Sequence, residues 1–182
     1  KGPVYAAIHW PLPNNHVGYS VLSGFLNLFG NSVIGLRGMS YLAALFNQVL
    51  LYRIGRKCFS YGWSLVCVLL YSCMNLVNQL AVQGRGYTLA VSCFLMAVYM
   101  LQIIGWKEER ETKRDFKYYG VFSVSLTFGL YILPSSVYWV IPVCVAGGLF
   151  LLSLGKIKPL VNLIISSLAA AFHTVLLYAV IW

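Results

Sequence analysis

Six apolar stretches, each near the length that crosses a membrane, occupy most of this 182-residue chain. An α-helix needs about 20 apolar residues to cross a hydrocarbon layer of roughly 30 Å. The predicted spans are residues 33–52, 61–80, 87–106, 118–133, 136–154 and 159–182. Because 60% of the residues are hydrophobic and 9% are charged, a soluble domain is excluded. The sequence predicts an all-α, multi-pass transmembrane helix bundle.

A shorter helix is predicted before the first span, at residues 16–29. Val17, Val21 and Phe25 recur there at helical spacing. A helix over this range is about 21 Å long, too short to cross a bilayer. We expect an amphipathic helix that lies in the membrane interface. Residues 1–15 contain three prolines and are expected to form an extracytoplasmic loop that is too broken for a helix.

The basic residues predict which side of the membrane each connection faces. The chain has 13 Lys and Arg against 4 Asp and Glu, a net charge of +9. Three, five and two basic residues lie in segments 53–57, 107–117 and 155–158, and the other three are Lys1, Arg37 and Arg85. Basic connections of membrane proteins face the cytoplasm. The positive charge is therefore interpreted as a topology signal, and no nucleic-acid partner is expected.

The chain lacks the short motifs of common enzyme classes. It contains no Walker loop, no GxSxG and no HExxH. Its five cysteines form no CxxC pair, so neither a zinc site nor a disulfide framework is indicated. No metal ligands and no cofactor are identified, and dependence on a divalent metal stays open.

Two arginines lie at the expected outer ends of spans. Arg37 belongs to the start of the first span, and Arg85 belongs to the turn before the third. A bundle can bring two such guanidinium groups together around an anion, and guanidinium groups bind phosphate oxygens in pairs. Arg37 and Arg85 are therefore candidates for a lipid-phosphate site. The alternative is that each side chain simply reaches the lipid headgroups.

Four more residues are candidates for substrate binding. His16 opens the short helix and is a candidate for binding a phosphate or a sugar hydroxyl. Asn15 precedes it, and a helix cap is the alternative role for this asparagine. Gln83 and Tyr87 flank Arg85 in one short turn. Tyr87 alone is also typical of an aromatic residue at a membrane interface.

Three stretches then occur in a fixed order. The first runs from Asn14-Asn15-His16 through Phe29-Gly30 and Arg37 to Gly55-Arg56-Lys57; the second is Gln83-Gly84-Arg85-Gly86-Tyr87; the third is Gly129-Leu130-Tyr131-Ile132-Leu133-Pro134-Ser135. Together they resemble segments of the GT-C membrane glycosyltransferases, in the family 39 and protein mannosyltransferase-like group. The resemblance covers about residues 10–140.

This resemblance implies an enzyme that transfers a sugar from a polyprenyl-phosphate carrier to a glycan, lipid or protein acceptor on the extracytoplasmic face. By position, the phosphate would be held by His16, Arg37 and Arg85, and in such enzymes a carboxylate acts as the base on the acceptor hydroxyl. Two positions depart from the pattern. His16 is followed by Val-Gly rather than Pro-Pro, and Gln83 stands where Glu is common.

All four acidic residues lie in segment 108–115, on the expected cytoplasmic side. A base at the outer face would then have to precede Lys1. We expect an Asp or Glu in a loop just before Lys1, and we expect this chain to be an N-terminal transmembrane part of the enzyme that is inactive alone. A multi-pass transporter or flippase is the alternative, with His173 and Gly147-Gly148 in its favour. A membrane scaffold without substrate is a third hypothesis.

Overall fold

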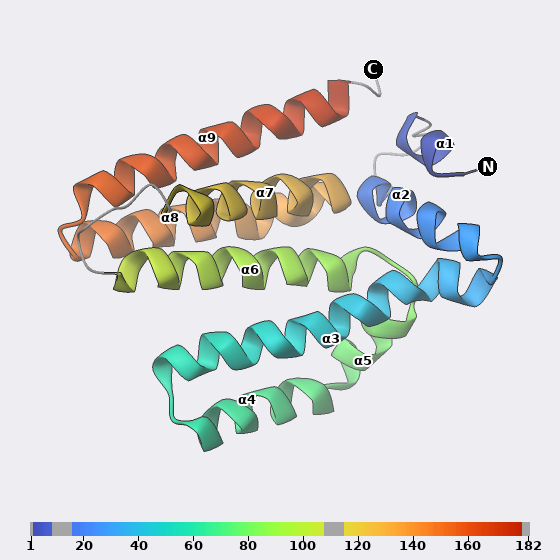
Figure 1. Cartoon of the computed structure of the whole chain (residues 1–182), viewed down its shortest axis with the longest axis horizontal. Helices are drawn as coiled ribbons and strands as arrows, with labels where there is room; N and C mark the ends of the chain where they lie inside the picture. The colour runs from blue at the N-terminus through green and yellow to red at the C-terminus, as the bar shows by residue number, and fades with distance from the viewer. Residues whose placement is uncertain (1, 9–15, 108–114, 180–182) are drawn as a thin grey trace.

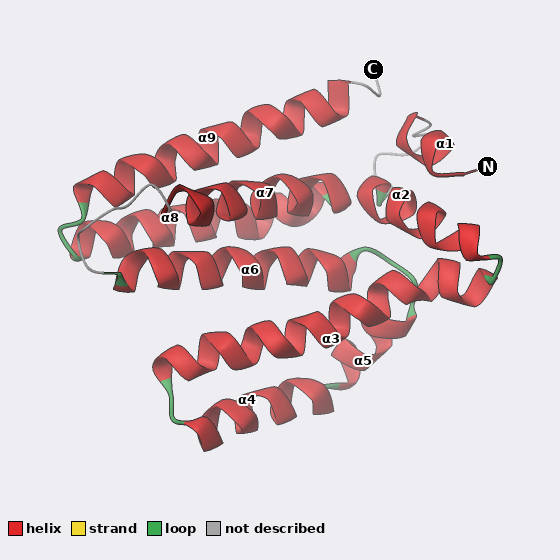
Figure 2. Cartoon of the chain, in the orientation of Figure 1, coloured by secondary structure: helices red, strands yellow, loops and turns green. Residues whose placement is uncertain are grey.

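The computed structural model describes residues 2–8, 16–107 and 115–179. Within these ranges the regular elements are all helices (Figures 1 and 2). In order they are α1 (Gly2–Ile8), α2 (Val17–Leu26), the short 3₁₀ helix η1 (Asn27–Phe29), α3 (Ser32–Cys58), α4 (Tyr61–Cys73), α5 (Asn75–Val82), α6 (Tyr87–Trp106), α7 (Phe116–Ile132), the 3₁₀ helix η3 (Pro134–Ser136), α8 (Val137–Ser153) and α9 (Ile157–Ala179). The all-α prediction is confirmed.

The long helices lie side by side (Figure 1). Helix α6 packs between α3 and α7, α9 packs against α7 and α8, and the α4–α5 pair packs on α3. Helix α2 lies at the end where α3 and α6 begin (Figure 1). We call this end, which carries the turn between α5 and α6, the Arg85 end. The opposite end, where α6 finishes, is the Trp106 end.

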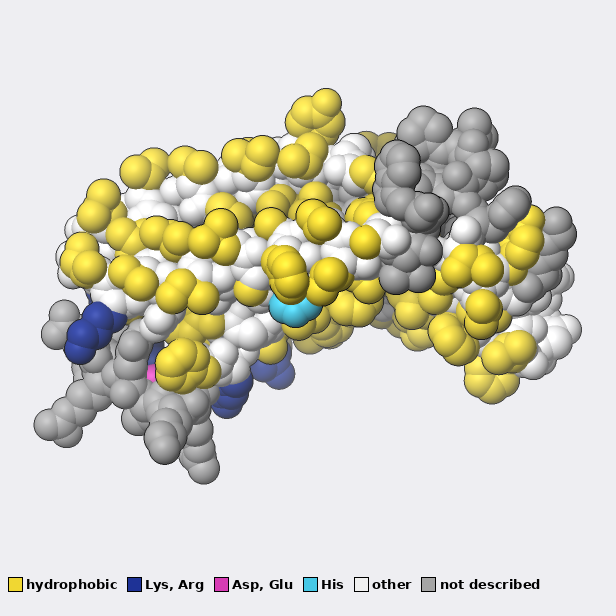
Figure 3. All heavy atoms as spheres, turned by 90° about the horizontal axis from the view of Figure 1, so that it is seen from above, with side chains coloured by type: hydrophobic (Ala, Val, Ile, Leu, Met, Phe, Trp, Pro, Cys, Tyr) yellow, Lys and Arg dark blue, Asp and Glu magenta, His cyan; other side chains and the backbone are white. Residues whose placement is uncertain are grey.

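The main core lies between α6, α7, α8 and α9. Phe122 and Leu126 of α7 lie at its centre and are 0% and 1% exposed. Small residues let the helices approach, since a Cβ on Gly147 would lie 2.8 Å from a methyl group of Leu101. The outer faces carry mostly apolar side chains (Figure 3). Such a surface is suited to lipid rather than to water.

Fewer helices reach membrane-spanning length than the sequence predicts. Six spans were expected, whereas four helices of the described residues are long and apolar enough, or five if α4 and α5 count as one broken span. Helix α7 has 17 residues, which makes it about 25 Å long, short of a hydrocarbon core of roughly 30 Å.

The span expected at 61–80 is broken at Met74. Helices α4 and α5 meet there at an angle of 64°. Met74 has an extended backbone, with ψ at 119°. The side-chain amide of Asn78 donates a 2.9 Å hydrogen bond to the carbonyl oxygen of Ser72. This bond satisfies a carbonyl that the break leaves without a helical partner. Asparagine side chains often bond to the backbone in this way, which makes them compete with a continuous helix.

Residues 1–15 also differ from the prediction, because Gly2–Ile8 form helix α1. Pro3 lies in the first turn of this helix, where a missing N–H costs no helical hydrogen bond. Pro11 and Pro13 lie outside the described residues. The prolines therefore permit a short helix here. It packs on α2, since a Cβ on Gly24 would lie 2.9 Å from the Cα of Pro3.

Helix α3 extends past the predicted end of the first span. The span was expected to close at Tyr52, with the basic segment 53–57 as a loop, but the helix continues to Cys58. Arg and Lys are good helix formers, and they stabilise the carbonyl end of a helix electrostatically. Both effects favour the continuation. Basic side chains gather at the Trp106 end (Figure 3), in two groups that line separate cavities.

Candidate functional site

The turn that carries Arg85 is fixed to α3. The hydroxyl of Ser40, which is fully buried, lies 3.0 Å from the carbonyl oxygen of Arg85. It also lies 3.0 Å from the hydroxyl of Tyr19 on α2, and its single proton can serve either acceptor. Tyr19 in turn donates a 2.6 Å hydrogen bond to the carbonyl oxygen of Leu36. The turn, α2 and α3 are therefore held in one polar network.

Two glycines allow this turn to approach its neighbours closely. Gly84 has a φ of +66°, a left-handed conformation that favours glycine, and a Cβ there would lie 2.7 Å from the carbonyl oxygen of Leu36. A Cβ on Gly86 would lie 2.8 Å from Nδ1 of His16 and 2.8 Å from a side-chain carbon of Ile132. Larger residues would push the turn away from α2, α3 and α7.

His16 contacts the same turn directly. Its Nδ1 accepts a 3.0 Å hydrogen bond from the backbone N–H of Gly86. Its ring meets the ring of Tyr87 edge to face, with centroids 4.8 Å apart. Because Nδ1 is an acceptor, the neutral ring carries its proton on Nε2. Burial, and secondarily the positive charge of Arg85, lower the pKa of His16 below its usual value. The imidazole is therefore a neutral hydrogen-bond donor at neutral pH.

The third sequence stretch reaches the same place. Ile132, at the end of α7, is 1% exposed and packs with Tyr19, Ala90 and Leu133 in a second hydrophobic core. A Cβ on Gly18 would lie 2.9 Å from the Tyr131 ring. Parts of all three stretches thus converge at the Arg85 end, whereas Gly55-Arg56-Lys57 of the first stretch lie at the Trp106 end of α3.

The structure places the predicted site residues as follows. His16, Arg85 and Tyr87 lie together, with His16 and Tyr87 half-buried and the Arg85 side chain exposed. Arg37 is exposed on α3, three residues before Ser40, and therefore lies on the same side of that helix. Gln83 is exposed, and its N–H bonds the Gln79 carbonyl as α5 ends. Asn15 lies outside the described residues.

An apolar cavity lies beside this site, between α2, α3, α6 and α7. Its volume is about 350 Å³. Leu22, Leu89 and Ile132 line it near the Arg85 end, and Met96 and Val124 line it further along α6 and α7. It offers an elongated hydrocarbon chain a place next to the polar residues.

Sequence reasoning did not identify Tyr19, Ser40 and Asn47. Asn47 of α3 is fully buried and donates a 3.0 Å hydrogen bond to the carbonyl oxygen of Thr88. Ser92 donates a 2.6 Å hydrogen bond to Asn47. The usable signal was a polar residue inside an apolar span, which is costly unless it has a partner. The helical period gives the face of such a residue but not its partner.

The described residues contain no cluster of His, Cys, Asp or Glu suited to a metal ion. Asp115 is the one acidic residue among them, and it forms an ion pair with Lys107 at the Trp106 end. Helix α6 has 20 residues, so this carboxylate is about 30 Å from the Arg85 end. The described part of the Arg85 end contains cations and hydrogen-bond donors, which suit an anionic ligand.

Comparison with known proteins gives a family. The sequence profile of the dolichyl-phosphate-mannose-protein mannosyltransferases matches residues 16–182. No curated protein and no solved structure matches the chain. From His16 onward the match includes the parts of the three stretches that meet at the Arg85 end, and it favours a glycosyltransferase over a transporter or flippase. With its apolar helices, the chain is an integral multi-pass membrane protein that belongs to the dolichyl-phosphate-mannose-protein mannosyltransferase family of membrane glycosyltransferases.

Proposed function

We propose that the Arg85 end binds the phosphate of a polyprenyl-phosphate sugar, and that the enzyme transfers this sugar to an acceptor on the extracytoplasmic side of the membrane. Arg37 and Arg85 bind the phosphate oxygens, and His16 donates a hydrogen bond from Nε2. Gln83, Tyr87 and Asn15 are proposed as contacts to the sugar or the phosphate. The acceptor is a glycan, a lipid or a protein.

One observation carries this proposal: the turn that presents Arg85 is hydrogen-bonded on both sides. His16 binds the N–H of Gly86, and Ser40 lies within hydrogen-bond distance of the Arg85 carbonyl. A turn held in this way keeps the Arg85 backbone in place while its side chain stays exposed. Such preorganisation is what makes charge stabilisation effective in catalysis.

The proposed chemistry divides the work between this site and a base. The bond between the anomeric carbon and the carrier phosphate breaks, and its electrons stay on the phosphate. The acceptor oxygen bonds to the anomeric carbon and gives its proton to a carboxylate. The described part of the Arg85 end holds no carboxylate. Its residues are therefore assigned to the leaving phosphate, where two guanidinium groups offset the developing negative charge.

The apolar cavity next to the site supports a polyprenyl carrier. We assign the first isoprene units to the cavity of about 350 Å³ between α3, α6 and α7. Ile132 at its near end adjoins Gly86, so that a phosphate at Arg85 would leave the hydrocarbon chain at the mouth of this cavity. Burial of apolar surface stabilises such binding by about 0.8 kcal/mol per CH₂ group.

The distribution of charge supports the proposed orientation. Ten of the 13 basic residues belong to the three segments assigned to the cytoplasmic side, which supports an extracytoplasmic position for the Arg85 end. Cysteine labelling tests this. With the five native cysteines replaced, Gln83→Cys should react with an impermeant maleimide added outside intact cells, and Lys158→Cys should not.

The function is tested in membranes by sugar transfer from a polyprenyl-phosphate donor, with each substitution made in the full-length enzyme, because this chain is expected to be inactive alone. Arg37→Ala and Arg85→Ala should each lower kcat/KM about a hundredfold or more, because each removes a charged donor to the transition state. Lys117→Ala, an exposed cation at the start of α7, is the matched control and should transfer normally. Normal turnover in both arginine variants would refute the phosphate site.

A further inference from the structure

A second group of cations lies at the Trp106 end, on the last two turns of α3. Arg53, Arg56 and Lys57 stand at positions i, i+3 and i+4 of a helix, so they share one face. All three side chains are exposed. In the connecting loop expected from the sequence these charges would have no common direction. On the helix they form an array.

An open cavity of about 530 Å³ lies beside this array. Three aromatic side chains complete its lining: Tyr52, Tyr99 and Trp106. Tyr99 and Trp106 are two turns apart on α6, so they lie on one face of that helix. The ammonium group of Lys57 lies 6.0 Å from the centroid of the Trp106 ring. We call the six lining residues the Arg53 cradle.

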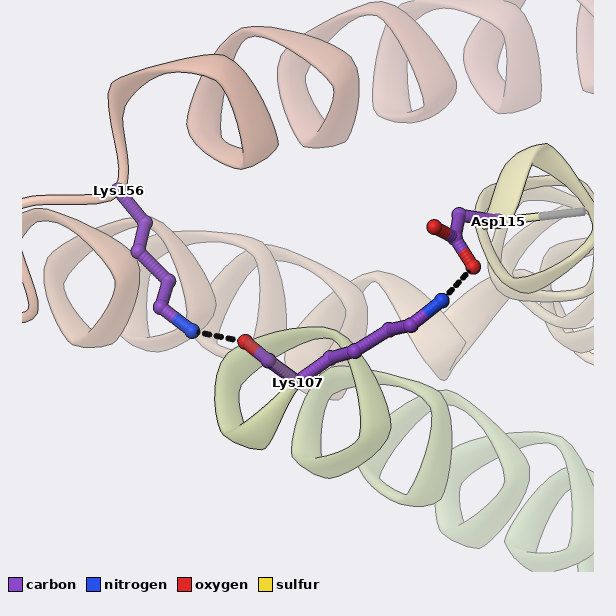
Figure 4. A network of polar contacts seen from close by, with 3 residues as sticks. All are labelled: Lys107, Asp115 and Lys156. Atoms are coloured by element: carbon purple, nitrogen blue, oxygen red, sulfur yellow. Dashed lines mark hydrogen bonds and ion pairs between the residues drawn. The ribbon is translucent and has the colours of Figure 1, made fainter. Parts of the chain in front are cut away.

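The cradle differs from the other basic cavity at this end, which lies between the ends of α6 to α9. There Lys107 pairs with Asp115 (Figure 4). Lys156 donates a hydrogen bond to the carbonyl oxygen of Lys107 (Figure 4). It donates another, of 2.8 Å, to the carbonyl oxygen of Gly105. Lys107 and Lys156 therefore hold the helix ends together.

The cations of the cradle have weaker partners. Arg56 donates a 3.3 Å hydrogen bond to the carbonyl oxygen of Phe59, and Lys57 faces an aromatic ring. Among the described residues no carboxylate pairs with Arg53, Arg56 or Lys57. Three neighbouring cations repel one another, and an anion between them would relieve this repulsion.

The surroundings favour a lipid as the source of that anion. The cradle lies where α3 and α6, two helices long and apolar enough to cross a membrane, reach their polar ends. Tyr and Trp side chains typically sit at the headgroup level of a bilayer. Val49, one turn before Arg53, is 50% exposed and continues the same helix face with apolar surface. A phosphate in the cradle would leave its acyl chains against that surface.

We propose that the Arg53 cradle binds the phosphate headgroup of an anionic phospholipid. The cradle is a separate site from the proposed donor site, because the length of α6, about 30 Å, lies between them. Its two guanidinium groups bind the phosphate oxygens, and the aromatic rings pack against the glycerol region. The bound lipid would set the depth of α3 and α6 in the membrane.

Quenching of Trp106 fluorescence tests this in vesicles that contain the protein and either brominated phosphatidylglycerol or brominated phosphatidylcholine. The signal of Trp106 is the difference between the unchanged protein and Trp106→Phe. Phosphatidylglycerol should quench it at a lower mole fraction than phosphatidylcholine, and the ratio of the two mole fractions at half-quenching measures the preference. In Arg53→Gln/Arg56→Gln this ratio should fall about fivefold for each cation removed. Circular dichroism verifies that the double variant is folded. If it is not folded, Arg53→Gln alone replaces it, with an expected loss of about fivefold in the preference.

The matched control is Lys117→Gln/Lys158→Gln, which removes two exposed cations of the same end that do not line the cradle. If the cradle binds the lipid, this control should keep the preference for phosphatidylglycerol. If surface charge in general attracts the lipid, both double variants should lose the preference equally. Added inorganic phosphate should not abolish the preference, as it would if the cradle bound free phosphate. Equal quenching by the two lipids, or an unchanged preference in the cradle variants, would overturn the proposal.

Discussion

The backbone N–H of Gly86 donates a 3.0 Å hydrogen bond to Nδ1 of His16, although the two residues are 70 positions apart in the chain. This bond joins the N-terminus of α2 to the turn that carries Arg85. It also sets the tautomer of the imidazole, because a ring that accepts at Nδ1 donates from Nε2. His16 thus has two tasks, one at each nitrogen, and substitutions can separate them.

Replacements of His16 should affect stability and transfer differently. In His16→Asn the side-chain oxygen lies near the place of Nδ1 and can accept the Gly86 N–H, but it has no group at the place of Nε2. We expect this variant to keep its thermal stability and to lose sugar transfer. His16→Ala should lose both, with about 1–3 kcal/mol of stability lost because a part-buried N–H is left unpaired. Unfolding in detergent and a transfer assay measure the two effects. Equal stability of the two variants would contradict this role.

The lowered pKa of His16 predicts a pH dependence of stability. The folded state binds the proton more weakly than the unfolded state, whose histidine pKa is about 6.5. The stabilisation is therefore complete above about pH 6.5 and is lost as the pH falls through the folded-state pKa. His16→Gln should flatten this part of the Tm profile. A profile that is the same in the unchanged protein and in His16→Gln would show that His16 is not its source.

Gly86→Ala should loosen the turn. Its Cβ would lie 2.8 Å from both Nδ1 of His16 and a carbon of Ile132, and neither neighbour is free to move far. We expect a loss of about 1–3 kcal/mol, the usual cost of overpacking, together with reduced transfer. Gly120→Ala is the control, because a Cβ there meets no atom within 4 Å and alanine favours a helix. Chemical unfolding compares the two, and a harmless Gly86→Ala would argue against the close packing of this turn.

Filling the apolar cavity should discriminate between donors by length. Met96 lines this cavity on α6, and Met96→Trp should narrow it. Transfer from a long polyprenyl-phosphate donor should then fall, while a donor with a short prenyl chain should be used as before. Leu149→Trp, at an exposed position of α8, controls for the added bulk. If Met96→Trp affects both donors equally, the chain does not lie in this cavity.

The fold could be predicted from the sequence to the extent that local rules decide it. Apolar length predicts the all-α bundle, and α6 has the bounds expected from its flanking residues, 87 and 106. The break at Met74 could not be predicted, because an apolar pattern does not reveal the side-chain bond from Asn78 to Ser72 that accompanies it. The continuation of α3 through Arg53 was missed because a cluster of charges was taken to end a span, although such residues form helices well.

The candidate site shows a similar division. The order of three stretches indicated His16, Arg37 and Arg85 as one group, with Tyr87 as a further candidate. The structure brings His16 and Tyr87 together at the turn that carries Arg85. The polar network of Tyr19 and Ser40 was not predicted, because these residues look like ordinary helix positions in an apolar stretch. Which polar residue finds which partner is decided by the packing of helices, and the sequence pattern of one helix does not contain that information.

Direct binding of a sugar-free polyprenyl phosphate tests the central claim most closely. The measurement compares the unchanged protein with Arg37→Gln, Arg85→Gln and the control Lys117→Gln in detergent micelles. If the two arginines bind the phosphate, each arginine variant should bind at least about tenfold more weakly, and the double variant should lose less than the sum of the two free-energy changes because both groups share one ligand. The control should bind normally. An affinity that is the same in all four variants would contradict a phosphate site at the Arg85 end.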